Sequence, residues 1–301
     1  MPDTIFTEPR PGVPARALRW FCTRRYFKGK YLIEEPAMRH VPLPHPRFAA
    51  TFDEGFTMVF RADDIYERVV YLHNCELDTY RFLVDTLRPG MTFFDCGANL
   101  GFFTLLASRL VGPTGKVVAF EPTPTTYARL AAHVEGNNIS NVDARPVALG
   151  AVPGRASVVA VRPEAHTMNA VGVPAGDAPV LAECDVVTID DVLAGGTPVP
   201  DVMKVDVEGA DLALLQGAEQ LLRGPRCPVL VVELCRMNDT RYGYEPEDIV
   251  KFLTSLRPFD MVWLDPRGRR TPVSPTDELP HYASLGPEHP SNYVFTPKLT
   301  A

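Results

Sequence analysis

One short segment, residues 93–104, restricts the fold more than any other part of the chain. It reads FFDCGANLGFFT and joins an apolar strand pattern, two glycines and the first turn of an apolar helix pattern. Gly97 and Gly101 have no Cβ and adopt positive φ easily, so the turn between them lets the backbone approach a ligand closely. A strand, a glycine turn and a helix in this order are typical of nucleotide-binding α/β proteins. The segment therefore predicts a cofactor loop at the end of a buried strand.

This loop departs from the pattern that binds dinucleotides. The G-x-G-x-x-G pattern needs glycines where Asn99 and Phe102 stand. Asp95 precedes the first glycine, where we expect its carboxylate to face the mouth of the loop. A carboxylate there repels a pyrophosphate but attracts a sulfonium or ammonium group. The loop therefore favours S-adenosylmethionine over NAD as the cofactor.

Composition excludes several other classes of protein. The chain has 301 residues, of which 46% are hydrophobic and 22% charged, which is typical of a globular protein with one large domain or two small ones. A net charge of -7 argues against a nucleic-acid partner, and no apolar run approaches the roughly 18 residues of a membrane span. Six cysteines without a C-x-x-C pair favour reduced thiols. We therefore expect a cytoplasmic protein with a small-molecule acceptor, and a homodimer is left open.

Strand and helix patterns alternate after the loop, which predicts a doubly wound α/β sheet, mostly parallel, with a late antiparallel strand. Beyond the strand at the loop, the expected strands are 116–121, 142–149, 202–205, 228–234, 261–264 and 293–295. A further antiparallel region is expected within 154–187, and a helix within 246–256. Before the loop we expect an extended arm, a hairpin over 48–59 and a single helical stretch over 63–87. The expected organisation is an N-terminal arm and hairpin (1–60), a cofactor-binding domain (61–265) and a C-terminal segment completing the sheet (266–301).

Acidic residues stand at or just after the ends of four expected strands. In open α/β sheets the ligand lies at the carboxyl ends of the strands, so we expect Asp95, Glu121, Asp206 and Glu233 at one edge. Glu121 follows the loop by about 20 positions, the separation at which an acid binds ribose hydroxyls. Asp95 suits the amino-acid part of the cofactor, and Ala148 is expected beside the adenine.

The turn after residues 202–205 carries the candidate catalytic groups. Methyl transfer requires an aligned acceptor, and an alcohol acceptor also loses a proton to a base. Lys204, Asp206 and Glu208 are the candidates, although Lys204 and Asp206 share an orientation along the strand and a structural ion pair is the alternative. His166 is the one histidine we interpret as a candidate base, and His133 is expected at the surface. No recognisable ligand spacing supports a metal site at these acids.

A second group of polar residues follows the strand at 228–234. These residues are interpreted either as a wall for the acceptor or as an ordinary solvated loop, and they are Arg236, Asn238, Tyr242 and Tyr244.

Five motifs occur in a fixed order: DCGANLGF at 95–102, FEP at 120–122, ALG at 148–150, TIDD at 188–191 and KVDVEG at 204–209. Over residues 71–234 the sequence resembles the FkbM family of S-adenosylmethionine-dependent methyltransferases. The resemblance implies a class I, Rossmann-like methyltransferase fold and O-methylation of a hydroxyl on a sugar, polyketide or other natural product. It also implies that Glu76, at the position of an upstream acid in the family, touches the cofactor.

The full set of expected cofactor-binding residues is Glu76, Asp95, Gly97, Asn99, Gly101, Phe102, Thr104, Glu121, Pro122, Ala148 and Asp206. Three alternatives remain at this stage. They are methylation of an amine or carboxylate, an NAD(P)-dependent oxidoreductase on the same scaffold, and a binding module that has kept the cofactor site without catalysis.

Overall fold

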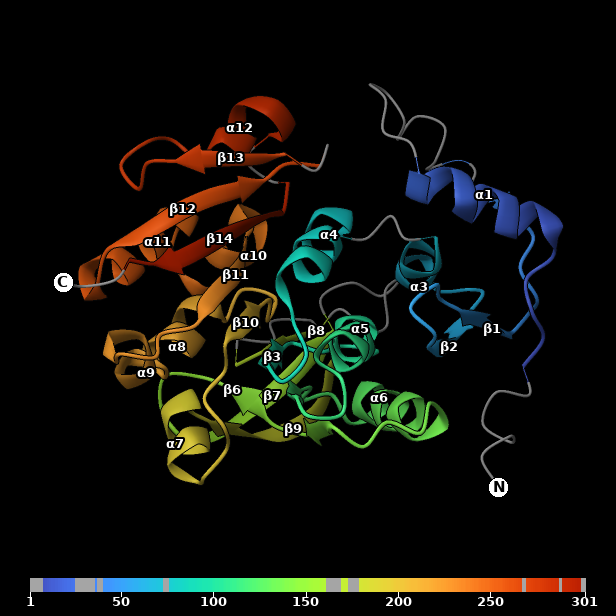
Figure 1. Ribbon diagram of the computed structural model, residues 1–301, viewed down its shortest axis with the longest axis horizontal. Coiled ribbons are helices and arrows are strands. Elements are labelled where there is room, and N and C mark those ends of the chain that lie inside the picture. The colour runs from blue at the N-terminus through green and yellow to red at the C-terminus, as the bar shows by residue number, and fades with distance from the viewer. Residues whose placement is uncertain are drawn as a thin grey trace.

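The computed structural model describes residues 8–24, 36, 40–72, 76–160, 169–172, 179–266, 269–286 and 289–298. Its centre is an eight-stranded sheet with the order β13-β12-β14-β11-β10-β3-β4-β5 (Figure 1). In that order the strands are Arg270–Val273, Phe259–Leu264, Ser291–Pro297, Val229–Leu234, Val202–Val205, Thr92–Cys96, Lys116–Phe120 and Val142–Arg145. The five strands from β11 to β5 are parallel, whereas β14 runs antiparallel to both of its neighbours. The predicted doubly wound sheet with a late antiparallel strand is confirmed.

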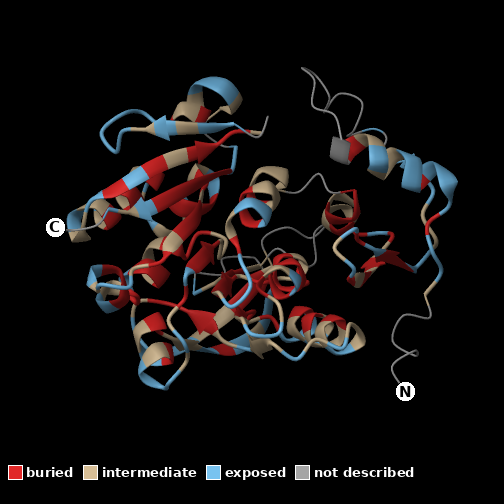
Figure 2. Ribbon diagram, in the orientation of Figure 1, coloured by how far each residue is buried: buried red, intermediate tan, exposed pale blue. Residues whose placement is uncertain are grey.

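Alternation along the strands explains why the sheet is covered on both faces. Neighbouring side chains of a strand point to opposite faces, and Phe93 and Phe94 of β3 accordingly belong to two different apolar clusters. Residues of α4 and α5 join the first cluster, and residues of α8, α9 and α11 join the second. The central strands are buried along most of their length (Figure 2). The carboxyl ends of these buried strands therefore hold the loops after β3, β4 and β10 in place.

The helices have the following bounds: α1 Val13–Arg24, α3 Ile65–Tyr71, α4 Leu77–Thr86, α5 Phe102–Val111, α6 Pro124–Gly136, α7 Ile189–Ala194, α8 Asp211–Gln216, α9 Glu219–Arg223, α10 Arg236–Asp239, the 3-10 turn η2 Thr240–Tyr242, α11 Pro246–Leu256 and α12 Pro280–Leu285. The predicted helix at 246–256 is confirmed to the residue. The stretch 63–87 forms α3 and α4 rather than one helix. None of the helices in the described ranges is long and apolar enough to cross a bilayer.

The N-terminal region differs from its prediction in one respect. The hairpin is confirmed as β1 (Arg47–Thr51) paired antiparallel with β2 (Thr57–Arg61). The expected extended arm instead contains the helix α1, whose Arg19 stacks over the ring of Phe52 in the turn of the hairpin. Figure 1 shows α1 and the hairpin together at the end of the molecule opposite β13. A helix forms here because the residue pattern from Val13 buries Ala15 and Cys22 on one side.

The remaining strands form a small second sheet with the order β6-β9-β7-β8. Its strands are β6 Ala148–Leu149, β9 Val180–Val187, β7 Gly154–Ala160 and β8 Asn169–Val171. The antiparallel pairing predicted within 154–187 is confirmed. The strand predicted over 142–149 is confirmed over Val142–Arg145, but its second half is wrong, because the chain leaves the main sheet after Arg145 and Ala148 pairs with β9 instead. Pro146 lies at that break and has no N–H to donate to a ladder.

Candidate active site

The register of the parallel strands brings four residues to one level at the carboxyl edge. Cys96 pairs with Phe120 of β4 and Val205 of β10, and Val205 pairs with Val232 of β11. The next residue on each strand is therefore Gly97, Glu121, Asp206 and Glu233 respectively. This confirms the expectation that the strand-end positions meet, except that Asp95 lies two residues below this level.

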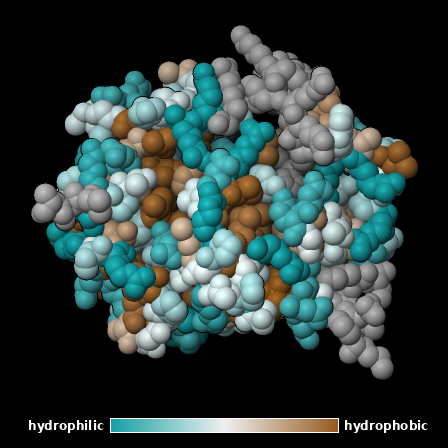
Figure 3. All heavy atoms as spheres, viewed as in Figure 1, coloured by the Kyte–Doolittle hydropathy of each residue, from teal (hydrophilic) through white to brown (hydrophobic). Residues whose placement is uncertain are grey.

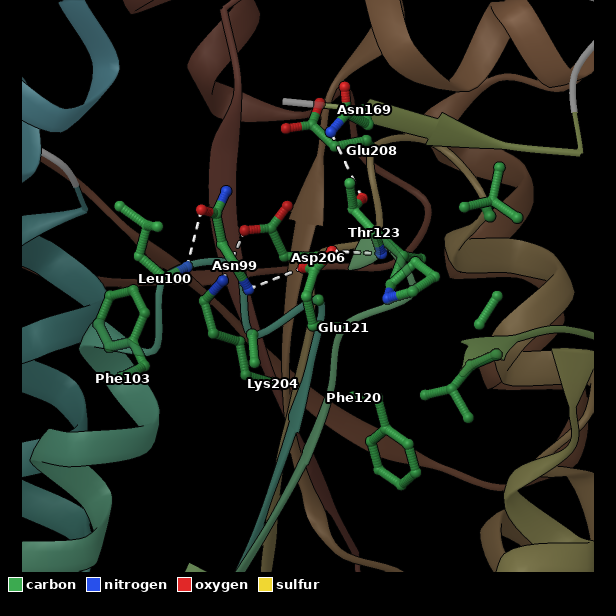
Figure 4. Close-up of a pocket in the computed structure, with 18 of the residues that line it drawn as sticks. Asn99, Leu100, Phe103, Phe120, Glu121, Thr123, Asn169, Lys204, Asp206 and Glu208 are labelled. Carbon is green, nitrogen blue, oxygen red and sulfur yellow. Dashed lines mark hydrogen bonds and ion pairs between the residues drawn. The ribbon is translucent and has the colours of Figure 1, made fainter. Parts of the chain in front are cut away.

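A cavity of about 1000 Å³, counted with its open mouth, lies over this edge. Figure 4 shows Glu208 and Asn169 together at one end of it and Phe120 at the other. The predicted site residues that line it are Glu76, Gly97, Asn99, Phe102, Glu121, Pro122, Ala148, Lys204, Asp206 and Glu208. Figure 3 shows hydrophobic and hydrophilic residues intermixed across the face seen in Figure 1.

The expectation that Asp95 faces the mouth of the loop is wrong. Asp95 is 1% exposed and does not line the cavity, because it lies below the loop, where its Oδ2 accepts a hydrogen bond of 2.5 Å from Thr104 Oγ1. Burial raises the pKa of Asp95 above its usual value, opposed by the charge of Lys204. Thr104 and Gly101 are also absent from the cavity wall. These three residues fasten the loop to the first turn of α5 from beneath.

Gly97 lies where two loops touch. It has φ of +87°, and a Cβ placed on it would be 1.8 Å from the carbonyl oxygen of Asp206. The backbone N–H of Asp206 in turn donates to the carbonyl of Cys96 at 3.2 Å. The glycine loop and the turn after β10 are therefore in direct backbone contact, which sets the width of the cavity between them.

Glu121 joins the glycine loop to the start of α6. One carboxylate oxygen accepts from the N–H of Asn99 at 3.0 Å and the other from the N–H of Thr123 at 2.8 Å. Burial raises the pKa of Glu121 to about 7, although these two backbone donors favour the ionised form. A carboxylate with a second lone pair on each oxygen can still accept hydrogen bonds from a ligand in the cavity.

Lys204 is a buried cation held between carboxylates. Its Nζ lies 2.5 Å from Asp206 Oδ2 and 3.4 Å from Glu76 Oε2, and it lies 5.0 Å from the centre of the Phe103 ring. Burial alone would lower its pKa, but the carboxylates of Asp206, Glu76 and Asp95 hold it well above the usual value. Lys204 therefore stays protonated, which removes it from the candidate bases and confirms the ion pair with Asp206.

Strained backbone marks the same cavity. Four non-glycine residues of the described chain have positive φ, and three of them, Glu76 (47°), Asn99 (50°) and Glu208 (56°), line the cavity. Left-handed conformations of such residues cost free energy and persist where the surrounding structure imposes them, most often at functional sites. Burial also raises the pKa of Glu76 above its usual value, while Lys204 lowers it and Asp206 raises it.

The residues after β11 do not line the cavity, so the predicted substrate wall is not found there. Arg236 pairs with Glu245 and stacks on Tyr282, away from the site. Asn238 donates to Glu208 Oε2 at 3.0 Å, and the hydroxyl of Tyr242 bonds the backbone of Val171. Tyr244 donates to the carbonyl of Gly209 at 2.6 Å. Two of the four, Asn238 and Tyr242, thus hold residues that line the cavity, and Tyr244 holds the turn beside it.

The small sheet contributes residues that the sequence did not indicate. Asn169 and Val171 of β8 line the cavity, and no motif surrounds them. Phe120 and Thr123 also line it, and their positions beside Glu121 could have revealed them. His166 lies outside the described residues. No set of three or more His, Cys, Asp or Glu suited to a metal ion occurs in the part of the chain that the structure describes.

A doubly wound sheet with a cavity over the carboxyl ends of its parallel strands defines the class of protein: a Rossmann-like α/β protein whose ligand binds at that edge. The methyltransferase FkbM domain matches residues 95–257, more than half of the chain, so the chain belongs to the FkbM methyltransferase family. This membership confirms the predicted family, enzyme class and cofactor, and it sets aside the oxidoreductase alternative.

Three relatives illustrate the family. Methyltransferase 1 of Beauveria bassiana is 30% identical over 163 residues, covering 47% of this chain and 63% of the relative. The hexuronic acid methyltransferase AglP of Haloferax volcanii is 25% identical over 183 residues, covering 60% and 69%. The 31-O-demethyl-FK506 methyltransferase FkbM of Streptomyces tacrolimicus is 30% identical over 175 residues, covering 49% and 66%. The chain spans just under two thirds of the first and third of these relatives.

Proposed function

We propose that this methyltransferase transfers the methyl group to a hydroxyl of a small molecule such as a sugar or a polyketide. The observation that carries the proposal is the division of the cavity. An apolar end beside Glu121 suits a nucleoside, and an end with Asp206 and Glu208 offers carboxylates to a hydroxyl. Two of the relatives are named for a hexuronic acid and for 31-O-demethyl-FK506, which supports a hydroxyl acceptor.

In this proposal the cofactor lies across the glycine loop. Glu121 accepts hydrogen bonds from the ribose hydroxyls, and Phe120 and Ala148 pack on the adenine. Glu76 and Asp206 face the amino-acid part, where their charges, only partly neutralised by Lys204, favour an ammonium and a sulfonium. S-adenosylmethionine supplies an electrophilic methyl group, and the chain supplies alignment and a proton acceptor.

We assign the proton acceptor to Glu208. Asp206 Oδ2 is engaged by the ammonium group of Lys204 at 2.5 Å, so this carboxylate serves the ion pair. Glu208 receives an amide hydrogen bond from Asn238, which stabilises a carboxylate less than an ammonium does. Its strained left-handed backbone sets the direction of the side chain at the end of the cavity away from Phe120.

Glu208→Gln is expected to lower kcat by about 100-fold or more while the dissociation constant of S-adenosylhomocysteine changes less than about threefold. The size and hydrogen-bonding shape of the side chain are kept, and only its ability to take a proton is lost. The measurement is transfer of a tritiated methyl group to panels of neutral sugars, macrolide polyols, phenols, amines and carboxylic acids, with calorimetry for binding. Normal turnover on a hydroxyl acceptor would remove Glu208 from the mechanism. Transfer to amines or carboxylic acids alone would overturn O-methylation.

Affinity for S-adenosylhomocysteine is expected to fall as the pH falls below about 7. The pKa of Glu121 is about 7 in the free protein, and ribose hydroxyls donate to the ionised form. Binding therefore expels a proton at low pH, and the dissociation constant rises by up to about tenfold per pH unit. Calorimetry at pH 6, 7 and 8 in two buffers of different ionisation enthalpy measures this release.

Glu121→Gln is the matched control for that experiment. The variant should bind more weakly at pH 8 and lose most of the pH dependence. Any slope that remains belongs to Glu76, the other cavity carboxylate facing the cofactor whose pKa burial raises. An unchanged slope in the variant would show that Glu121 does not titrate on binding.

A further inference from the structure

His133 of α6 is a buried link between the glycine loop and the N-terminal hairpin. The sequence predicted a surface position, but the residue is 3% exposed. Its Nδ1 lies 2.9 Å from the carbonyl oxygen of Leu100, inside the glycine loop, and its Nε2 lies 3.0 Å from the backbone nitrogen of Val59, on β2. One imidazole ring therefore contacts both segments.

The partners fix the tautomer of this ring. A carbonyl oxygen only accepts, so Nδ1 carries the proton and donates to Leu100, and Nε2 accepts from the N–H of Val59. Burial, together with the charge of Arg129, lowers the pKa of His133 to about 4. The ring is therefore neutral at neutral pH and can make both hydrogen bonds at once.

The face of α6 that carries His133 makes hydrogen bonds with the backbone of β2, as a neighbouring strand would. Positions 129, 133 and 137 are four residues apart and lie on one side of the helix. Arg129 donates to the carbonyl of Val59, and Asn137 both accepts from the N–H and donates to the carbonyl of Thr57. Side chains of α6 therefore make hydrogen bonds with the backbone groups on the edge of β2 that does not face β1. Among the described contacts of these three residues, only those of His133 also include the glycine loop.

Aromatic contacts join the hairpin to the other flank of the glycine loop. Phe102 begins α5 directly after Gly101 and lines the cavity. Its ring lies 5.2 Å from Phe52 and 5.9 Å from Phe56, both in edge-on contacts. The hairpin therefore supports the loop at two points, the carbonyl of Leu100 and the ring of Phe102.

We propose that the β1–β2 hairpin is a working part of the cofactor site, and that His133 is the positioning residue through which it holds the glycine loop in its binding conformation. The hairpin lies outside residues 95–257, the segment that the family domain matches. The inference rests on the proposed placement of the cofactor over this loop. It also means that the boundary expected near residue 60 does not separate the hairpin from the function of the domain.

The decisive variants change the hydrogen bonds that positions 133 and 137 can make. His133→Leu removes both bonds and leaves the buried carbonyl of Leu100 without its partner, so S-adenosylhomocysteine should bind about tenfold more weakly. His133→Gln offers an N–H and an oxygen at similar reach and should restore affinity to within about threefold. Asn137→Leu removes the bonds to Thr57 and one to the backbone carbonyl of His133, and it leaves the imidazole ring and the loop in contact. It should lower the melting temperature while leaving affinity within about threefold.

Equal losses of affinity in His133→Leu and Asn137→Leu, or no loss in His133→Leu, would overturn the proposal. A measurement on the unaltered protein keeps the test independent of how the variants fold. Saturating S-adenosylhomocysteine should slow hydrogen exchange in β2 about tenfold more than in β13, at the far end of the sheet. Equal slowing in the two strands would refute the coupling. If the unaltered protein did not bind S-adenosylhomocysteine, the proposed function would fail instead.

Discussion

Lys204→Met is expected to destabilise the folded protein by about 3–5 kcal/mol, which is the usual cost of removing one partner from a buried ion pair. The lysine is 2% exposed and faces the carboxylates of Asp206 and Glu76 at 2.5 and 3.4 Å, with Asp95 adding to the negative charge. Without the cation, these carboxylates must either remain ionised near one another or bind protons. Urea unfolding at pH 8 measures the loss.

The way the loss of stability in Lys204→Met changes with pH distinguishes unpaired carboxylates from a simple loss of packing. Burial raises the pKa values of Glu76 and Asp95 above their unfolded values, and the variant loses the lysine charge that opposes this, so in the variant protonated forms favour the folded state. The deficit in stability should therefore shrink as the pH falls from 8 towards 5. A deficit that is constant with pH would mean that the lysine acts through its apolar stem.

Arg223→Met provides a matched control for the loss of a cation. Arg223 pairs with Glu219 at 2.8 Å on the surface of α9, where both side chains are about half exposed. Exposed pairs of this kind contribute about 0–1 kcal/mol. A similar loss of stability in the two variants would contradict the special role of the buried pair.

The parts of the site that the sequence predicted correctly are those fixed by local pattern. The glycine turn, the strands on either side of it and Glu121 each follow from residues within a few positions of one another. Because parallel strands end at the same edge, the order of these patterns along the chain was enough to bring Glu121 and Asp206 together. The ion pair of Lys204 with Asp206 followed from the same alternation along β10.

The errors concern contacts between residues far apart in the chain. His133 looks like a surface residue on α6 because its partner Val59 is 74 positions away. Asn169 reaches the cavity only because β8 belongs to the second sheet, and no local motif predicts that pairing. Asp95 was placed two residues too high because the level at which a strand ends depends on register with its neighbours. Tertiary packing decides such details, and single-sequence patterns do not contain it.

Gly97→Ala is expected to weaken S-adenosylhomocysteine binding by roughly 100-fold, equivalent to about 2.7 kcal/mol. The added methyl group would lie 1.8 Å from the carbonyl oxygen of Asp206, a backbone atom that cannot rotate away. The glycine loop and the turn after β10 must therefore separate, which moves both walls of the cavity, and such overpacking typically costs 1–3 kcal/mol. Calorimetry measures the loss of affinity.

Gly196→Ala separates the clash from the conformational cost of the substitution. Gly196 has φ of +90°, close to the +87° of Gly97, but a Cβ there would meet no atom within 4 Å. Both variants carry the penalty of an alanine at positive φ, so both should lose a similar amount of stability from that source. Only Gly97→Ala should lose affinity, because only there does the methyl group push the two loops apart. If the two variants bound S-adenosylhomocysteine equally well, the close approach of Gly97 to Asp206 would not be what shapes the cofactor site.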